Sequence, residues 1–233
     1  MNCIPNSLCR NCKWYKTSKC KPEPFIIKKG DVFNHTIEVL KHAKPTVEAQ
    51  LAALLHDVGK PSTQKILEDK IQYLGHEEVG EDIAEAIMRR LKFELKTIKR
   101  VKSIVRNHMR PHSINRNKGG AKALRKFIRK VGDELVDAVL DMAEADSLGT
   151  LPPKNYIPEL RKQIEEVRKI PIKLEPVLDG REIMEILNIK SGKMIGEVKN
   201  YLKDLEDEYV SKGKTLTKSV AKKMILKEFG DSL

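Results

Sequence analysis

A chain of 233 residues, with 5% aromatic and 33% charged residues, is long enough to bury a core in one domain or two small ones. It has no apolar run near the ~20 residues of a membrane span and no apolar core of a signal peptide, so we expect a cytoplasmic protein without membrane contact. The net charge of +12 favours a polyanionic partner such as RNA or a nucleotide, unless a lysine-rich proteome makes every surface basic.

The first twenty residues contain all four cysteines, at positions Cys3, Cys9, Cys12 and Cys20. The tight pair Cys9 and Cys12 has the spacing of tetrahedral zinc sites, and a reducing cytosol disfavours disulfides. We therefore predict a Cys-rich arm over residues 1–24 that binds zinc or an iron–sulfur cluster. Its aromatic and basic residues would suit RNA contact; the alternative is a structural staple that holds the arm.

Hydrophobic periodicity predicts an all-α protein. The expected helices cover residues 31–43, 45–55, 76–91, 95–109, 120–131, 133–148, 156–169, 179–188, 191–212 and 216–229. Residues 62–73 predict a short hairpin or loop, and residues 111–120 predict a basic loop. The paired prolines at 152 and 153 divide the chain into a domain over 25–153 and a helical C-terminal region over 154–233.

Residues 51–61, with the sequence LAALLHDVGKP, are the most informative stretch. They begin as a helix that is apolar on nearly every side, which predicts burial, and they place His56 beside Asp57 before a glycine and a proline. Burying two ionisable side chains is costly unless they are paired or bind a metal. A divalent ion would explain the pair; the alternative is a histidine that caps the helix beside a surface aspartate.

Other predicted helices each place one candidate metal ligand in line with their apolar residues. These candidates are His35, His76, His108 and Asp146. A single histidine on an apolar face is usually a core residue, but several helices that each deliver one ligand indicate a shared metal site. Periodicity does not separate His35 from His42, which lies on the same side of its helix.

The order His, His-Asp, His, His, Asp resembles that of the HD phosphohydrolase superfamily. Residues 51–61, 73–80, 89–93, 105–110, 125–132, 143–146, 178–184 and 192–196 resemble the HD domain and C-terminal region of bacterial CCA-adding tRNA nucleotidyltransferases. The likeness extends over roughly residues 30 to 225, implies an HD-type helical bundle and selects His35 over His42. The chain departs from that family because it shows neither the Gly-Ser phosphate loop nor the paired-aspartate strand of the nucleotide-polymerising head.

A divalent ion (Mn, Ni, Mg or Fe) is expected at this site. Its predicted ligands are His35, His56, Asp57 and Asp146. The likeness to HD phosphodiesterases adds His76 and His108 as ligands of a second ion that Asp57 would bridge, whereas the likeness to the CCA-adding enzymes leaves a single ion as the alternative. Asp57 and Lys60 are the predicted catalytic residues, and Lys60 would hold a phosphoryl oxygen.

Three further residues are expected to contact the substrate. His112 and Arg116 lie in the predicted basic loop, which could clamp a phosphate or simply be solvated. Lys193 opens a predicted helix, where free backbone N–H groups also favour phosphate. An ordinary helix start is the alternative there.

We therefore predict a metal-dependent phosphohydrolase that acts on RNA ends, 2′,3′-cyclic phosphates or nucleotides. The alternative is an RNA-binding module, the body and tail of a split tRNA nucleotidyltransferase, which works with a separate nucleotidyltransferase subunit and has a non-catalytic HD site. The complete ligand set favours the enzyme, because a decayed site usually loses ligands first.

Overall fold

The computed structural model describes residues 32–67, 70–150, 152–170, 172 and 175–230. Its helices are α1 (Val32–His42), α2 (Val47–Leu55), α3 (Lys60–Thr63), α4 (His76–Arg90), α5 (Leu95–Asn107), α6 (Met109–Arg116), α7 (Ala121–Val131), α8 (Asp133–Leu148), α9 (Ile157–Arg168), α10 (Gly180–Leu187), α11 (Lys193–Ser211) and α12 (Lys218–Phe229). The all-α prediction is thus confirmed. The Cys-rich arm lies outside the described residues, so its metal site stays a prediction.

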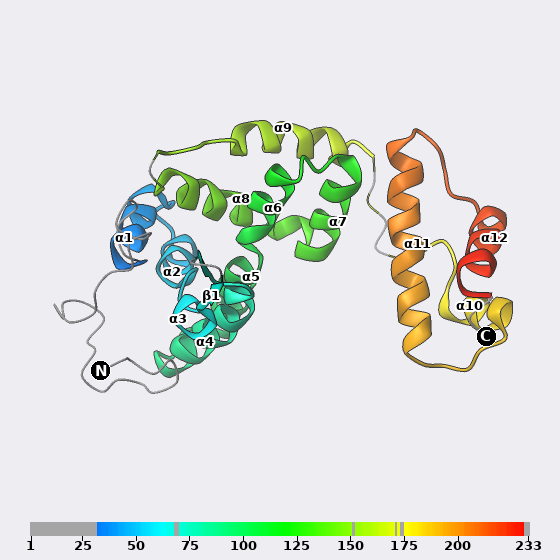
Figure 1. Cartoon of the computed structure of the whole chain (residues 1–233), viewed down its shortest axis with the longest axis horizontal. Helices are drawn as coiled ribbons and strands as arrows, with labels where there is room; N and C mark the ends of the chain where they lie inside the picture. The colour runs from blue at the N-terminus through cyan, green and yellow to red at the C-terminus, as the bar shows by residue number, and fades with distance from the viewer. Residues whose placement is uncertain (1–31, 68–69, 151, 171, 173–174, 231–233) are drawn as a thin grey trace. The chain divides into compact units, whose positions relative to one another are not determined.

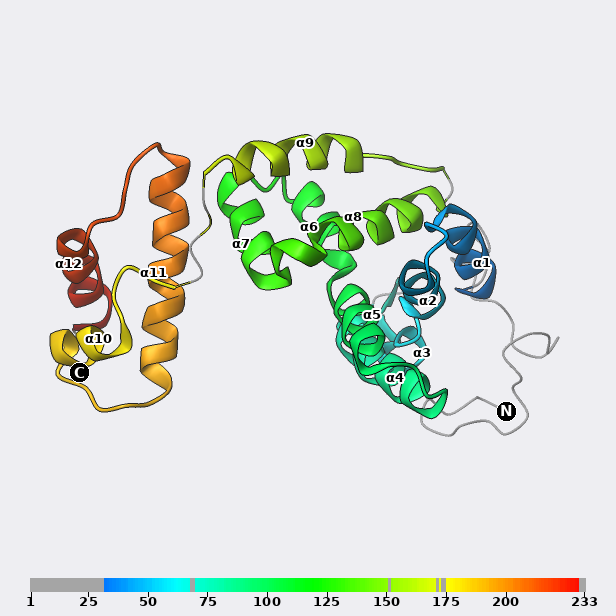
Figure 2. The same cartoon turned by 180° about the vertical axis from the view of Figure 1, so that it is seen from behind.

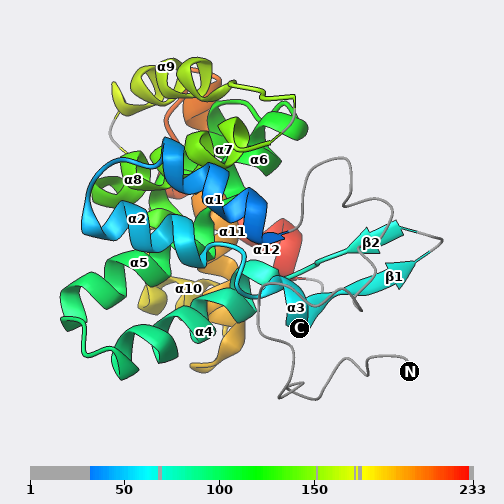
Figure 3. The same cartoon turned by 90° about the vertical axis from the view of Figure 1, so that its left-hand side faces the viewer.

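A small hairpin interrupts the helices. Strands β1 (Lys65–Leu67) and β2 (Lys70–Gln72) pair antiparallel, with Ile66 opposite Ile71. This resolves the predicted hairpin or loop over residues 62–73 as a hairpin. Figure 3 shows that the two strands reach away from the helices beside α3.

The predicted basic loop over residues 111–120 is wrong in its first half, because α6 continues to Arg116. Pro111 is the third residue of α6. A proline in the first turn removes no intrahelical hydrogen bond, because the N–H groups there have no carbonyl partner. Proline therefore does not break this helix.

The chain forms two compact units, and each unit consists of two separate segments of the sequence. Unit 1 comprises residues 1–115 and 133–161, and unit 2 comprises residues 116–132 and 162–233. Helix α7 therefore belongs with the C-terminal helices. The predicted functional division between residues 153 and 154 stays a prediction.

In unit 1, α1 packs against α2 and α8, α2 also packs against α5 and α8, and α4 lies along α5 (Figure 1 and, from behind, Figure 2). Val39, Ala52, Val101 and Val139 are fully buried at these contacts. Helix α2 begins at a Thr46 cap, whose hydroxyl accepts a hydrogen bond from the backbone N–H of Ala49. At the other end of α2, and at the end of α5, the residues that follow the helix, His56 and His108, are buried.

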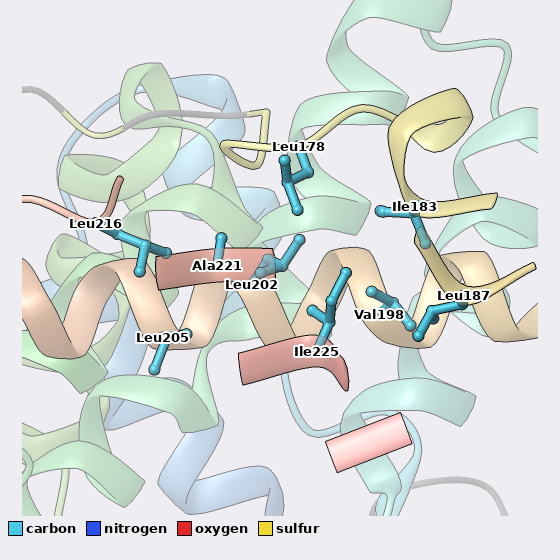
Figure 4. Close-up of a cluster of buried hydrophobic side chains, with 9 residues drawn as sticks. All are labelled: Leu178, Ile183, Leu187, Val198, Leu202, Leu205, Leu216, Ala221 and Ile225. Atoms are coloured by element: carbon cyan, nitrogen blue, oxygen red, sulfur yellow. The ribbon is translucent and has the colours of Figure 1, made fainter. Parts of the chain in front are cut away.

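The core of unit 2 lies among α10, α11 and α12 (Figure 4). It consists of Leu178, Ile183, Leu187, Val198, Leu202, Leu205, Leu216, Ala221 and Ile225. The fully buried Asp207 joins α11 to α7, because its Oδ1 accepts hydrogen bonds from Arg125 Nε (3.0 Å) and Arg129 (2.6 Å). Two guanidinium groups offset the cost of burying this carboxylate. No helix in the described part of the chain is both long enough and apolar enough to span a membrane.

Candidate metal centre

Helices of unit 1 bring together all six predicted ligands of the HD site. They form two groups, one of His35, His56 and Asp146 and the other of Asp57, His76 and His108. Within each group the potential ligand atoms all lie within 4.8 Å of one another. Helices α1, α4 and α8 contain His35, His76 and Asp146, whereas the other three residues directly follow the ends of α2 and α5. Such a set of imidazole and carboxylate groups suits a divalent transition metal.

Three of the histidines are oriented by their own helix ends. In each of them Nδ1 lies close to the backbone carbonyl oxygen of the residue three positions earlier. The distances are 2.8 Å from His56 to Ala53, 2.8 Å from His76 to Tyr73 and 2.6 Å from His108 to Val105. A carbonyl oxygen can only accept, so each Nδ1 carries the hydrogen and donates it. In the neutral ring, Nε2 is then the atom with a free lone pair, which is the form that a metal requires.

His35 is oriented by a residue far away in the sequence. Its Nδ1 lies 3.3 Å from the carbonyl oxygen of Gly149, just beyond α8. A Cβ atom at position 149 would lie 2.7 Å from Cγ2 of Val39, so only glycine lets the end of α8 approach α1 this closely. The fourth histidine therefore also presents Nε2 to the site.

The Nε2 atoms face one another in pairs. Those of His35 and His56 lie 3.4 Å apart, and those of His76 and His108 lie 3.3 Å apart. Two lone pairs at this distance repel each other unless a proton or a cation lies between them. Oδ1 of Asp146 lies 2.9 Å from Nε2 of His35 and adds negative charge to the first group. The donor set therefore fits a divalent cation in each group.

Asp57 lies between the two groups. Its Oδ2 is 3.2 Å from Nε2 of His56, and its Oδ1 is 3.5 Å from Nε2 of His76. The turn after Asp57 lies directly against α4, because a Cβ at Gly59 would be 2.1 Å from the carbonyl oxygen of His76. One carboxylate thus offers one oxygen to each group, the arrangement of a ligand that bridges two ions.

The carboxyl groups of the site are held in their ionised form. Burial would raise the pKa of Asp57, but the nearby His56 and Lys60 lower it below its ordinary value. Lys60 Nζ lies 2.5 Å from Oδ2 of Asp57 and 5.6 Å from the centre of the Tyr73 ring. Burial would likewise raise the pKa of Asp146, whereas its close neighbours His112 and His35 lower it well below its ordinary value. Both carboxylates are therefore available to a cation.

Two buried histidines have opposite pKa shifts. Burial lowers the pKa of His56, but the charges of Asp57 and Asp146 outweigh it, so its pKa is raised from 6.5. Burial and the charge of His56 lower the pKa of His108 to about 3. Below its raised pKa, His56 holds a proton that a metal must displace, whereas His108 is neutral above about pH 3.

Metal binding should release a proton from His56 and weaken as the pH falls. Because the metal-free protein holds this proton below the raised pKa of His56, affinity should drop about tenfold per pH unit below that pKa. Calorimetric titration with Mn²⁺ at about pH 6 and about pH 8, in buffers of different ionisation enthalpy, measures the proton release. Equal affinity and no released proton across this range would contradict the assignment.

The remaining predicted residues have different surroundings. His112 lies on α6, with Nε2 2.9 Å from Oδ2 of Asp146. Arg116 is exposed, and Lys193 is 94% exposed with its Nζ 3.6 Å from Glu197; both belong to unit 2, and their substrate contacts stay predictions. His42 is exposed at the end of α1.

Sequence reasoning missed Tyr156, whose hydroxyl lies 2.6 Å from Nδ1 of His112. The two residues are 44 positions apart, and no periodic pattern includes this tyrosine. The carbonyl partners of His56, His76 and His108 could have been anticipated from their spacing of three residues, whereas Gly149 could not.

The chain is similar in sequence to known proteins. The HD domain family model matches residues 32–151, which include all six predicted ligands. The CC-adding tRNA nucleotidyltransferase of Thermus thermophilus is 35% identical over 201 residues, which cover 83% of this chain and 44% of that protein. The A-adding tRNA nucleotidyltransferase of Deinococcus radiodurans is 30% identical over 182 residues, which cover 72% of this chain and 41% of that protein. The chain thus spans less than half of the length of these curated relatives. No solved structure matches.

Proposed function

Because the chain belongs to the HD domain family, we propose that it is a metal-dependent phosphohydrolase with a two-ion centre. Its substrates in this proposal are phosphate esters at RNA ends, 2′,3′-cyclic phosphates or nucleotides. The observation that carries the proposal is the position of Asp57, whose two carboxylate oxygens face His56 in one ligand group and His76 in the other.

Bound divalent ions offset the negative charge of a phosphoryl-transfer transition state and lower the pKa of bound water. In the hydrolysis, the water oxygen forms a bond to phosphorus, the P–O ester bond breaks, and the released oxygen takes up a proton. Lys60 binds Asp57 through one of its three N–H groups, and its side chain is 24% exposed. Its other N–H groups would hold a non-bridging oxygen of the phosphate.

An RNA substrate is supported by the charge of unit 2. This unit contains 22 Lys and Arg against 13 Asp and Glu, so it carries nine of the twelve net positive charges of the chain. Such an excess attracts a polyanion through counterion release. The likeness to tRNA nucleotidyltransferases supports tRNA as that polyanion.

A second candidate function is that of an RNA-binding body-and-tail module whose HD site is not catalytic. It is favoured by the relatives themselves, which are CC-adding and A-adding tRNA nucleotidyltransferases aligned over less than half of their length. In this case a separate nucleotidyltransferase subunit would supply the polymerising head.

Assay of the full-length protein on small substrates separates the two candidates. Metal-free protein is loaded with Mn²⁺, Ni²⁺ or Mg²⁺ and tested on 2′,3′-cyclic nucleotides, nucleoside monophosphates and an aryl phosphodiester. We expect turnover that a chelator abolishes and the same ion restores. A protein that binds tRNA but leaves every ester intact with each ion would establish the binding module instead.

A further inference from the structure

His112 and Tyr156 form a polar pair beside the first ligand group. Nε2 of His112 lies 2.9 Å from Oδ2 of Asp146, the carboxylate oxygen that does not face His35. Nδ1 of His112 lies 2.6 Å from the hydroxyl oxygen of Tyr156, and the two rings meet edge to face with centres 5.9 Å apart. His112 is not part of the compact group of ligand atoms formed by His35, His56 and Asp146.

The partners of His112 determine which ring nitrogen carries the hydrogen. A carboxylate oxygen only accepts, so the nitrogen that faces Asp146 must be the donor. In the neutral ring, Nδ1 is then an acceptor, and the Tyr156 hydroxyl donates to it. The tyrosine thereby selects the tautomer that directs an N–H group at the carboxylate.

The buried Nε2 of His112 makes no well-aligned hydrogen bond with any described residue, although Oδ2 of Asp146 is within reach. A buried donor without an aligned acceptor costs free energy, so it needs an explanation. Oδ2 of Asp146, 2.9 Å away, is the acceptor that a change in the orientation of its carboxylate would bring into line with this donor.

Tyr156 is held in place by contacts to the helix that contains Asp146. The side-chain amide of Asn155 donates to Oε1 of Glu144 (3.0 Å), while its Oδ1 accepts from the backbone N–H of Ile157. A few residues on, Arg161 donates to Oδ1 of Asp141 (2.5 Å). Hydrogen bonds from the residues before and after Tyr156 therefore hold the start of α9 against α8.

We propose that His112 and Tyr156 are positioning residues that orient the Asp146 carboxylate for the ion of the first ligand group. The inference rests on the proposed metal centre and deepens it. His112 acts through Asp146 and not on the substrate, and it does so in the tautomer that Tyr156 selects. Tyr156 lies beyond the segment that matches the HD domain model, residues 32–151.

The test is a Mn²⁺ titration of the full-length protein and three variants, followed by calorimetry and electron paramagnetic resonance. His112→Leu removes the donor, His112→Gln keeps an N–H group for Asp146, and Tyr156→Phe removes only the hydroxyl. In His112→Leu we expect one of two binding steps to weaken about 10–100-fold, the typical cost of losing a hydrogen-bond partner of a metal ligand. His112→Gln should restore most of this loss, and Tyr156→Phe should show a smaller loss in the same step.

Thermal unfolding of the metal-free variants separates positioning from folding. The inference requires that His112→Leu and His112→Gln unfold at similar midpoint temperatures although they bind Mn²⁺ with different affinities. It is overturned if His112→Leu binds Mn²⁺ as tightly as the unaltered protein, or if Leu and Gln weaken both steps equally. If the unaltered protein binds no Mn²⁺, Ni²⁺ or Mg²⁺, both the proposed function and this inference fail. If it binds these ions and His112→Leu binds them equally well, only this inference fails.

Discussion

Asp57→Asn should abolish phosphate-ester hydrolysis and reduce the number of bound ions from two to one or none. The substitution keeps the size of the side chain but removes the charge 3.2 Å from Nε2 of His56. Loss of a hydrogen-bond partner of a metal ligand already lowers metal affinity or activity about 10–100-fold. Loss of a ligand that both groups share should therefore lower kcat/KM at least about 100-fold. Steady-state kinetics and elemental analysis of the purified variant measure the two effects.

The fold should survive this substitution. Lys60, which loses its partner, is 24% exposed, so water can solvate its charge. Asp82→Asn on α4 is the matched control, because it removes the same charge from an exposed position of unit 1 and should leave turnover unchanged. Wild-type turnover by Asp57→Asn with Mn²⁺ or Ni²⁺ supplied would refute the assignment of the centre.

Neutralising the exposed lysines of α12 should weaken tRNA binding while small-substrate hydrolysis continues. Lys222, Lys223 and Lys227 are exposed on this helix of the basic unit. Replacing all three with Gln should lower tRNA affinity about 10–100-fold and reduce the slope of log Kd against log salt by up to about 3, roughly one per lost phosphate contact. Filter binding across a salt series measures both quantities.

The matched control replaces three exposed lysines of unit 1, Lys92, Lys96 and Lys99, with Gln. It removes the same total charge, so a general effect of net charge would lower tRNA affinity equally in both triple variants. Equal losses would show that tRNA does not contact α12 in particular.

Much of the fold follows from local patterns. Helical periodicity located the described helices other than α3 and α6 to within a few residues, because a buried helix needs an apolar stripe. The predicted basic loop over residues 111–120 is helical as far as Arg116, because Pro111 lies in the first turn of α6, where a proline has no hydrogen bond to lose.

The amino-acid sequence by itself determined the fold class and the candidate ligands, because each stands on an apolar face or at the end of a helix. The family resemblance selected His35 over His42 and implied two groups that share Asp57. Only the tertiary structure decided which backbone contacts hold these residues in place. Asp57 faces both groups because Gly59 lets its turn lie against α4, and His35 is oriented by Gly149, 114 positions away. The pairing of His112 with Tyr156 and the place of α7 in unit 2 arise in the same way. Such contacts depend on how closely two backbones can approach, and no periodic pattern along one helix records that distance.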